Sequence, residues 1–224
     1  MSKRISKELI WVWLLYLSAG YLNALTLLLF SETAVGQTGR MTSMVFHFFQ
    51  NNEKMAYQLL FLSIAFLAGA VLSGLFFSRR KFDPQNKKVG WVPILLGTGL
   101  ILVDFIPDLS PFVLYYVCLL LGVQNSLYVS YRNSSVSSTA LTSAISNFGA
   151  AIGNLVRGEK ESVQRIIYFS GDVLAHILGA SLCFALALYN NRLLLEMGAL
   201  LYIIIGGYFW FFRKDFSIDG SSIG

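Results

Sequence analysis

Two ionisable side chains lie four residues apart in an otherwise apolar stretch of the sequence. Asp172 and His176 fall within 166–189, a run long enough to cross a membrane. A separation of four places them on one face of a helix. Ionisable groups inside a bilayer are costly unless they are paired or hydrated. A carboxylate beside an imidazole therefore predicts a proton relay or a coupling site, with a purely structural pair reached by interfacial water as the equal alternative.

Three side-chain amides also fall inside apolar stretches. Asn23 lies in the first stretch, and the adjacent Gln124 and Asn125 lie in a later one. Amides in lipid must find hydrogen-bond partners, and they often bridge helices. As structural glue they need no ligand. The functional interpretation is that the amides face each other between two halves of the protein and line a polar pathway.

Small polar residues gather in two weakly apolar segments that follow these amides. They are Thr38, Gly39 and Arg40 in the first segment, and Thr139, Thr142 and Ser143 in the second. Hydroxyl groups and free backbone N–H groups at a helix start can hold an anion, and Arg40 adds a positive charge. The pattern predicts a path for a small polar or anionic solute. The competing interpretation is that Arg40 contacts lipid headgroups or a neighbouring helix.

Motifs typical of the main enzyme and metal-binding classes are missing from the sequence. It holds no Walker loop, no His-Glu-x-x-His, no Gly-x-Ser-x-Gly and no paired catalytic carboxylates. Cys118 and Cys183 lie far apart in apolar stretches, which predicts neither a metal site nor a disulfide framework. We therefore expect no cofactor, no metal and no catalytic residue. An intramembrane lipid-modifying enzyme using Asp172 and His176 is the weaker alternative.

The composition is that of a membrane protein. Of 224 residues, 55% are hydrophobic and only 13% are charged, which is far from the usage of a soluble domain. Runs of roughly 20 apolar residues match the thickness of a bilayer core. We predict an all-α polytopic membrane protein with six strong spans at 9–30, 57–78, 91–106, 112–131, 166–189 and 193–212. The segments 31–56 and 132–165 are weaker.

Positive charge favours six crossings over eight. With six spans and the N-terminus inside, most of the 17 Lys and Arg fall in cytoplasmic segments, whereas eight crossings would place the cluster at 79–88 outside. Both termini are then cytoplasmic. The net charge of +5 sets topology in this interpretation, so we expect no nucleic-acid partner. Segments 31–56 and 132–165 become re-entrant hairpins from opposite faces, or else kinked spans or surface helices.

The two hairpins divide the chain into related halves. Residues 1–110 hold three spans and an outer hairpin, 111–214 hold three spans and an inner hairpin, and 215–224 form a disordered tail. Gly20 corresponds to Gly122, Thr38 to Thr142, and Gly69-Ala70 to 179–180. Inverted repeats with broken helices recur in transporters.

The motifs carrying this repeat also resemble a known family. They are Gly20-Tyr21-Leu22-Asn23-Ala24, Thr38-Gly39-Arg40, Gly122-Val123-Gln124-Asn125-Ser126 and Thr139-Ala140-Leu141-Thr142-Ser143. In order and spacing they resemble the YoaK family of bacterial inner-membrane proteins, whose function is uncharacterised. The resemblance covers about residues 10–212 and implies a multi-pass protein of the bacterial inner membrane. The chain departs from the family pattern at Asn23, Arg40 and Ser143, where the family has an acid, an amide and a glycine.

The sequence favours a permease or channel-like protein that passes a small polar or anionic solute between its two halves. Asp172 and His176 would supply proton coupling. With only six spans, a homo-oligomer could be needed to complete the pathway. The principal alternative is a non-transporting membrane scaffold whose polar residues serve packing alone.

Overall fold

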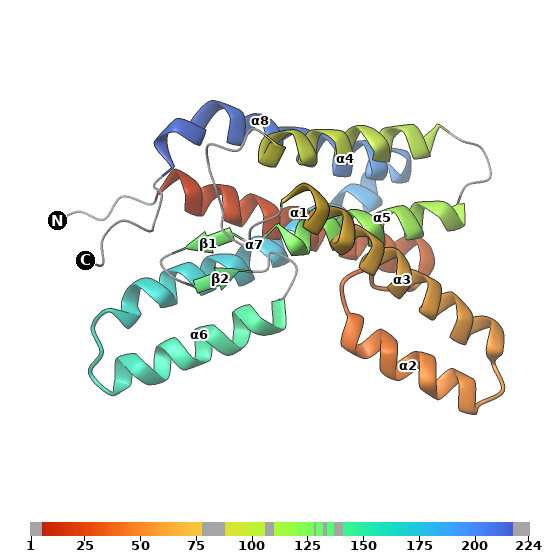
Figure 1. The fold of residues 1–224 in the computed structure, drawn as a ribbon, viewed down its shortest axis with the longest axis horizontal. Coiled ribbons are helices and arrows are strands. Elements are labelled where there is room, and N and C mark those ends of the chain that lie inside the picture. The colour runs from red at the N-terminus through yellow and green to blue at the C-terminus, as the bar shows by residue number, and fades with distance from the viewer. Residues whose placement is uncertain are drawn as a thin grey trace.

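The computed structural model describes residues 6–77, 88–105, 110–127, 129–131, 134–136 and 141–216. This part of the chain is helical, as predicted, and contains eight α-helices (Figure 1). The helices are α1 (Lys7–Phe30), α2 (Gln37–Phe49), α3 (Glu53–Phe76), α4 (Lys88–Asp104), α5 (Ser110–Ser126), α6 (Leu141–Val156), α7 (Ser162–Tyr189) and α8 (Leu194–Phe212). Short 3-10 turns, Asn191–Leu193 and Arg213–Asp215, flank α8.

Four helices are long and apolar enough to cross a membrane: α1, α3, α7 and the segment containing α8. The apolar helices α4 and α5 are shorter. Large apolar side chains cover the outside of the bundle, with Leu75, Leu188 and Phe211 each at least 74% exposed. Such a surface suits lipid rather than water. The protein is therefore a multi-pass, membrane-embedded helical protein.

The predicted fourth span needs a correction at its end. Helix α5 ends at Ser126, not at Tyr131, and the chain enters the short strand β1 (Val129–Tyr131). Strand β1 pairs antiparallel with β2 (Ser134–Val136), with Val129 opposite Val136. The basic cluster expected at 79–88 lies almost wholly outside the described residues, as do Thr139 and the tail beyond Phe216.

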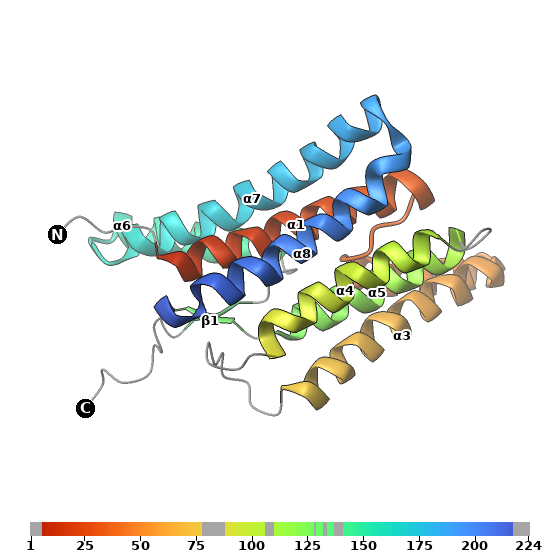
Figure 2. The same cartoon turned by 90° about the horizontal axis from the view of Figure 1, so that it is seen from above.

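The helices associate mainly in three pairs. The most extensive contacts join α1 to α7, α3 to α5, and α4 to α8, while α2 packs on α3 and α6 on α7. Figure 2 shows α1 with α7 on one side and α3 with α5 on the other. Helix α1 is the most enclosed of the four long spans, with 61% of its apolar window buried against 28% for α3 and α7. It is therefore the long span that contacts the other helices most fully.

Glycines bring the backbones of two pairs into direct contact. A Cβ on Gly20 of α1 would collide with the His176 carbonyl of α7, and one on Gly179 would collide with that of Leu17. A second such contact joins α3 and α5, where Gly69 meets the Leu119 carbonyl and Gly122 meets the Phe66 carbonyl. Small residues are what permit close approach of helices in membranes.

Both ends of the described chain lie at one end of the bundle. The Lys7 ammonium lies 2.6 Å from the Asp215 carboxylate, and Phe216 packs on Trp11 with ring centroids 6.3 Å apart. Trp91 and Trp210 meet at the same end, with ring centroids 5.5 Å apart. Tryptophan side chains thus gather at this end of the bundle, and Trp is enriched at membrane–water interfaces.

Candidate functional site

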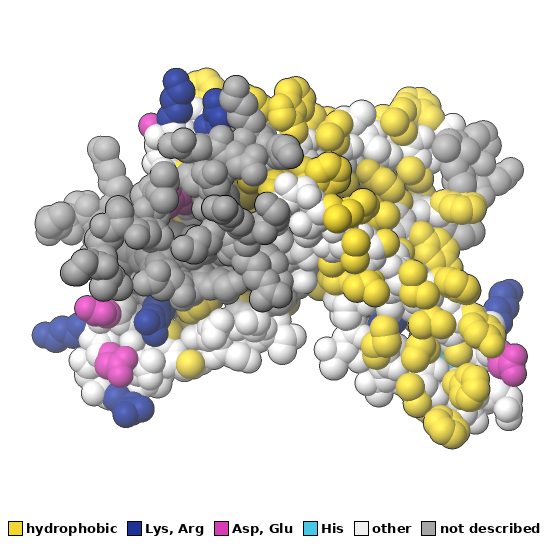
Figure 3. Space-filling view, in the orientation of Figure 1, with side chains coloured by type: hydrophobic (Ala, Val, Ile, Leu, Met, Phe, Trp, Pro, Cys, Tyr) yellow, Lys and Arg dark blue, Asp and Glu magenta, His cyan; other side chains and the backbone are white. Residues whose placement is uncertain are grey.

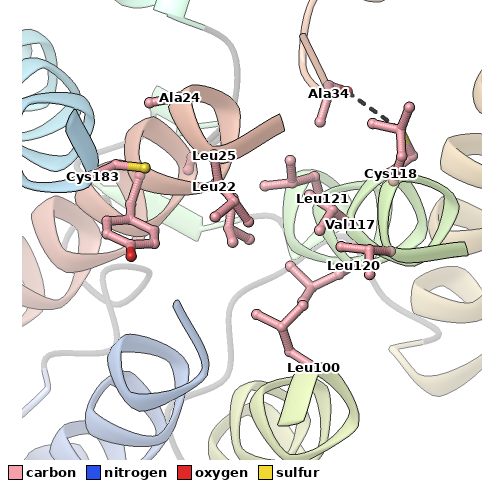
Figure 4. Packing of buried hydrophobic residues seen from close by; sticks show 14 of the residues in the cluster. Leu22, Ala24, Leu25, Ala34, Leu100, Val117, Cys118, Leu120, Leu121 and Cys183 are labelled. Carbon is pink, nitrogen blue, oxygen red and sulfur yellow. Dashed lines mark hydrogen bonds between the residues drawn. The ribbon is translucent and has the colours of Figure 1, made fainter. Parts of the chain in front are cut away.

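The segment between α1 and α2 turns back into the bundle instead of continuing outward. Thr26 Oγ1 accepts the Ala34 N–H at 3.1 Å, and Asn23 Oδ1 accepts the Val35 N–H at 3.2 Å. Asn23 lies seven residues before the end of α1, which corresponds to about 10 Å along the helix axis. On the other side, Cys118 Sγ in the middle of α5 lies 4.0 Å from the Ala34 carbonyl oxygen (Figure 4). Residues 31–36, called the re-entrant segment below, therefore turn back along α1 toward α5, and α2 begins beside them.

Helix α2 then leads outward, and α6 occupies the corresponding place at the opposite end of the bundle (Figure 1). Each short helix folds back on a long one, α2 on α3 and α6 on α7. Left-handed residues form both hairpin corners, Asn51 with φ 54° and Gly158 with φ 95°. Figure 3 shows the surface hollowed between the lobe of α6 and the lobe of α2.

Arg40 is buried in the first turn of α2, only 4% exposed. Its Nη1 donates to Gln37 Oε1 at 3.2 Å and its Nη2 donates to the Thr33 carbonyl, while its Nε has no partner among the described residues. The guanidinium also lies beside the Cys118 thiol. The described carboxylates form no ion pair with it. Arg40 thus fixes the re-entrant segment and brings a cation into the bundle without an ion pair to a described carboxylate.

Gln124 joins three helices at the centre of the bundle. Its side chain is fully buried, its Nε2 donates to the Leu15 carbonyl of α1 at 2.8 Å, and its Oε1 accepts from the Tyr202 hydroxyl of α8. The Ser18 hydroxyl lies within hydrogen-bonding range of Tyr202. Asn125, the next residue of α5, is half-buried and has interactions of its own. The predicted bridging of helices by Gln124 is therefore present.

Asp172 and His176 are buried at the contact between α7 and α1. Asp172 is completely inaccessible, and neither its carboxylate oxygens nor His176 Nδ1 has a hydrogen-bond partner among the described residues. Asp172 lies close to Tyr16 of α1. The backbone carbonyl of His176 contacts Gly20 of α1. Since buried polar groups are nearly always hydrogen-bonded, this pair is the most unusual polar feature of the described bundle.

The predicted hydroxyl residues do not join this buried group. Thr38 and Gly39 are exposed on α2, and Thr142 and Ser143 are exposed at the start of α6. Thr139 lies outside the described residues. The candidate site therefore divides into buried residues inside the bundle and exposed polar residues on the two short helices.

Sequence reasoning missed the tyrosines of the central cluster. Tyr16 and Tyr202 are buried beside Asp172 and Gln124. A tyrosine in mid-span, where its hydroxyl needs a partner, was the available signal. Among the described residues, no group of His, Cys, Asp and Glu is arranged to hold a metal ion.

Comparison with known proteins identifies one relationship. The model of a family described as a protein of unknown function (DUF1275) matches residues 11–207. No curated protein and no solved structure matches the chain. The match confirms the expected membership of an uncharacterised family, whereas the YoaK name stays a prediction.

Proposed function

The chain belongs to this family of unknown function, and from its geometry we propose that it is a permease or channel-like protein. It passes a small polar or anionic solute through a pathway between two halves of the bundle. The observation that carries the proposal is the re-entrant segment 31–36 with buried Arg40. Irregular backbone at membrane depth is tolerated where protein surrounds it or where it lines a water-filled cavity, and broken helices of this kind form the solute sites of transporters.

The proposal includes six spans with both termini in the cytoplasm of a bacterial cell. The four long helices are joined by the apolar helices α4 and α5 as shorter spans. The bond from Lys7 to Asp215 supports a common side for the two ends of the described chain. The basic leader and tail favour the cytoplasm for that side.

We further propose that residues 1–110 and 111–214 are inverted repeats. The pairing of α1 with α7 has its counterpart in that of α5 with α3, and the pairing of α2 with α3 in that of α6 with α7. The glycine contacts show the same correspondence between the two halves. Gly20 and Gly122 are 102 residues apart, and so are the carbonyls of Leu17 and Leu119 that meet Gly179 and Gly69.

Asp172 and His176 serve as the coupling site in this proposal. Both are buried without hydrogen-bond partners among the described residues, and an ionisable residue inside a membrane is by default a candidate for proton or ion coupling. Gln124 of the second half donates to the Leu15 carbonyl of α1 in the first half, so a movement of one half can reach the other through this hydrogen bond.

The test is flux in proteoliposomes of purified protein, with phosphate, acetate and benzoate as probes in parallel under an imposed pH gradient. We expect flux of at least one anion above that of protein-free vesicles. Asp172→Asn should abolish its dependence on the gradient, whereas the matched control Asp104→Asn, at the end of α4, should retain it.

Gln124→Leu should reduce flux while the protein still elutes as a folded species in size exclusion. Absence of flux for every probe, with Asp172→Asn folded as stably as the parent, would sink the transport proposal and leave the scaffold.

A further inference from the structure

A cavity of about 540 Å³ lies at the end of the bundle opposite the two chain ends. Its α3 wall is formed by Lys54, Tyr57, Gln58 and Phe61. These residues follow the i, i+3, i+4, i+7 spacing and so make one face of the helix. The volume falls within the range of small-molecule sites, roughly 300–1,000 Å³.

The opposite wall places this cavity directly outward of the re-entrant segment. It is formed by Phe30 at the end of α1 and by Leu114 and Tyr115 of α5. Leu114 lies one helical turn from Cys118 on the same face of α5, and Cys118 contacts Ala34. A solute leaving the cavity toward the centre would meet residues 31–36 next.

The one charged side chain among the lining residues of this cavity is a cation, Lys54. Lys54 is exposed in the first turn of α3, where the helix dipole also favours a negative group. The described carboxylates form no ion pair with Lys54. Further inward is the buried guanidinium of Arg40 beside Cys118, and the Glu32 carboxylate is also close enough to act on that thiol. The charge that lines the cavity itself is positive, which suits an anion.

The remaining lining residues indicate what kind of anion fits. Gln58 and the hydroxyls of Tyr57 and Tyr115 provide hydrogen bonds, while Phe30, Phe61 and Leu114 provide an apolar wall. An inorganic ion would leave that wall without a contact. We propose that this cavity is the outer binding site for a small organic monoanion with an apolar body, which rests on the proposed function by naming the solute class.

The experiment is calorimetric titration of the purified full chain in phosphatidylcholine nanodiscs, with benzoate as the probe. We expect benzoate to bind and its uncharged-headgroup counterpart, benzyl alcohol, to bind much more weakly. Lys54→Gln should weaken benzoate binding by about tenfold through loss of a charge-assisted contact. Gln58→Leu should weaken it by less.

The matched control is Arg192→Gln, which removes another exposed cation, from the turn before α8 outside the cavity. It should leave the affinity unchanged. Equal affinity of the parent and Lys54→Gln would overturn the assignment. The anion in the cavity could instead be a lipid headgroup, which is tested by repeating the titration in phosphatidylglycerol nanodiscs. If that lipid displaces benzoate, the cavity holds a lipid headgroup and the solute assignment is wrong.

The titration measures binding without transport, so the two proposals fail separately. Benzoate binding that depends on Lys54, with no flux of any probe, keeps the cavity assignment and removes the permease. Flux that is unaffected by Lys54→Gln, together with unaltered benzoate affinity, keeps the permease and removes the cavity.

Discussion

Under the proposed topology α2 with α3 form an outer hairpin and α6 with α7 form an inner one, and the two hairpins differ in their buried polar residues although they pack alike. Under the proposed repeat, Arg40 of the outer hairpin corresponds to Ala144, and Asp172 and His176 of the inner hairpin correspond to Leu62 and Phe66. Arg40 and Asp172 are both buried. The frame of helix contacts is therefore repeated, while the buried ionisable residue is an arginine in one half and an aspartate in the other.

The glycines set the positions of the helices, whereas the buried polar residues differ between the halves. Backbone contacts at Gly20, Gly69, Gly122 and Gly179 occur in two equivalent sets, each between a helix of one half and a helix of the other, because they position helices. A buried ionisable group destabilises the fold unless it is compensated. Arg40 and Asp172 each lack a counterpart in the other half, which supports the functional roles proposed for them.

The largest expected difference between the two hairpins is the side of the membrane from which their corners can be labelled. In a background with Cys118 and Cys183 replaced by Ala, a single cysteine at Asn51 should react with an impermeant maleimide in intact cells. A single cysteine at Glu159 should react only after permeabilisation. Labelling of both corners from the same side would contradict the inverted arrangement.

The glycine contacts should respond alike in the two halves. Gly20→Ala and Gly122→Ala each place a methyl group against a carbonyl of the partner helix, which must move away. We expect each to lower the free energy of unfolding by about 2–3 kcal/mol, measured by denaturation in detergent.

The control for both substitutions is Gly74→Ala, since nothing lies within 4 Å of a Cβ there. Its expected change is within about 0.5 kcal/mol. A large loss at Gly20 with none at Gly122 would break the correspondence between the halves.

Arg40→Met should loosen the re-entrant segment, because it removes the hydrogen bonds to Thr33 and Gln37. Stability should fall by about 2 kcal/mol. The local readout is the rate at which the Cys118 thiol reacts with a small maleimide, which should rise. Cys183, equally buried but on α7, is an internal control whose rate should not change.

The smallest effect is expected from Asp172→Leu, which copies the residue at the corresponding place in the outer hairpin. Removing an unpaired buried carboxyl should leave stability unchanged or raise it by about 1 kcal/mol, as measured by denaturation beside Asp104→Leu. A fall in the free energy of unfolding by more than about 1 kcal/mol would show that Asp172 has a structural partner. It would also remove the reason for assigning Asp172 a coupling role.

Much of the helical frame could be predicted from the sequence, because lipid imposes long apolar runs. The expected span 193–212 agrees with α8 (Leu194–Phe212), and the expected span 9–30 with α1 (Lys7–Phe30). The end of α5 could not be predicted, since Val129 and Tyr131 suit a strand as well as a helix.

The candidate site was predicted less completely. The burial of Gln124 and Asp172 followed from their apolar surroundings, but the exposure of Thr38 and Thr142 did not, because it depends on which face of a short helix contacts its long partner. The roles of Tyr16 and Tyr202 required the register between helices that are distant in sequence.

The contact between Gly20 and His176 also means that α1 can pack on α7 only late in synthesis of the chain. The two residues are separated by about 150 positions, which a ribosome takes on the order of ten seconds to translate. During that interval α1 lies in the bilayer without its main neighbour, its small-residue face turned to lipid. Chains truncated before α7 should thus be substrates for membrane quality control, and completion of the fold is among the last events of synthesis.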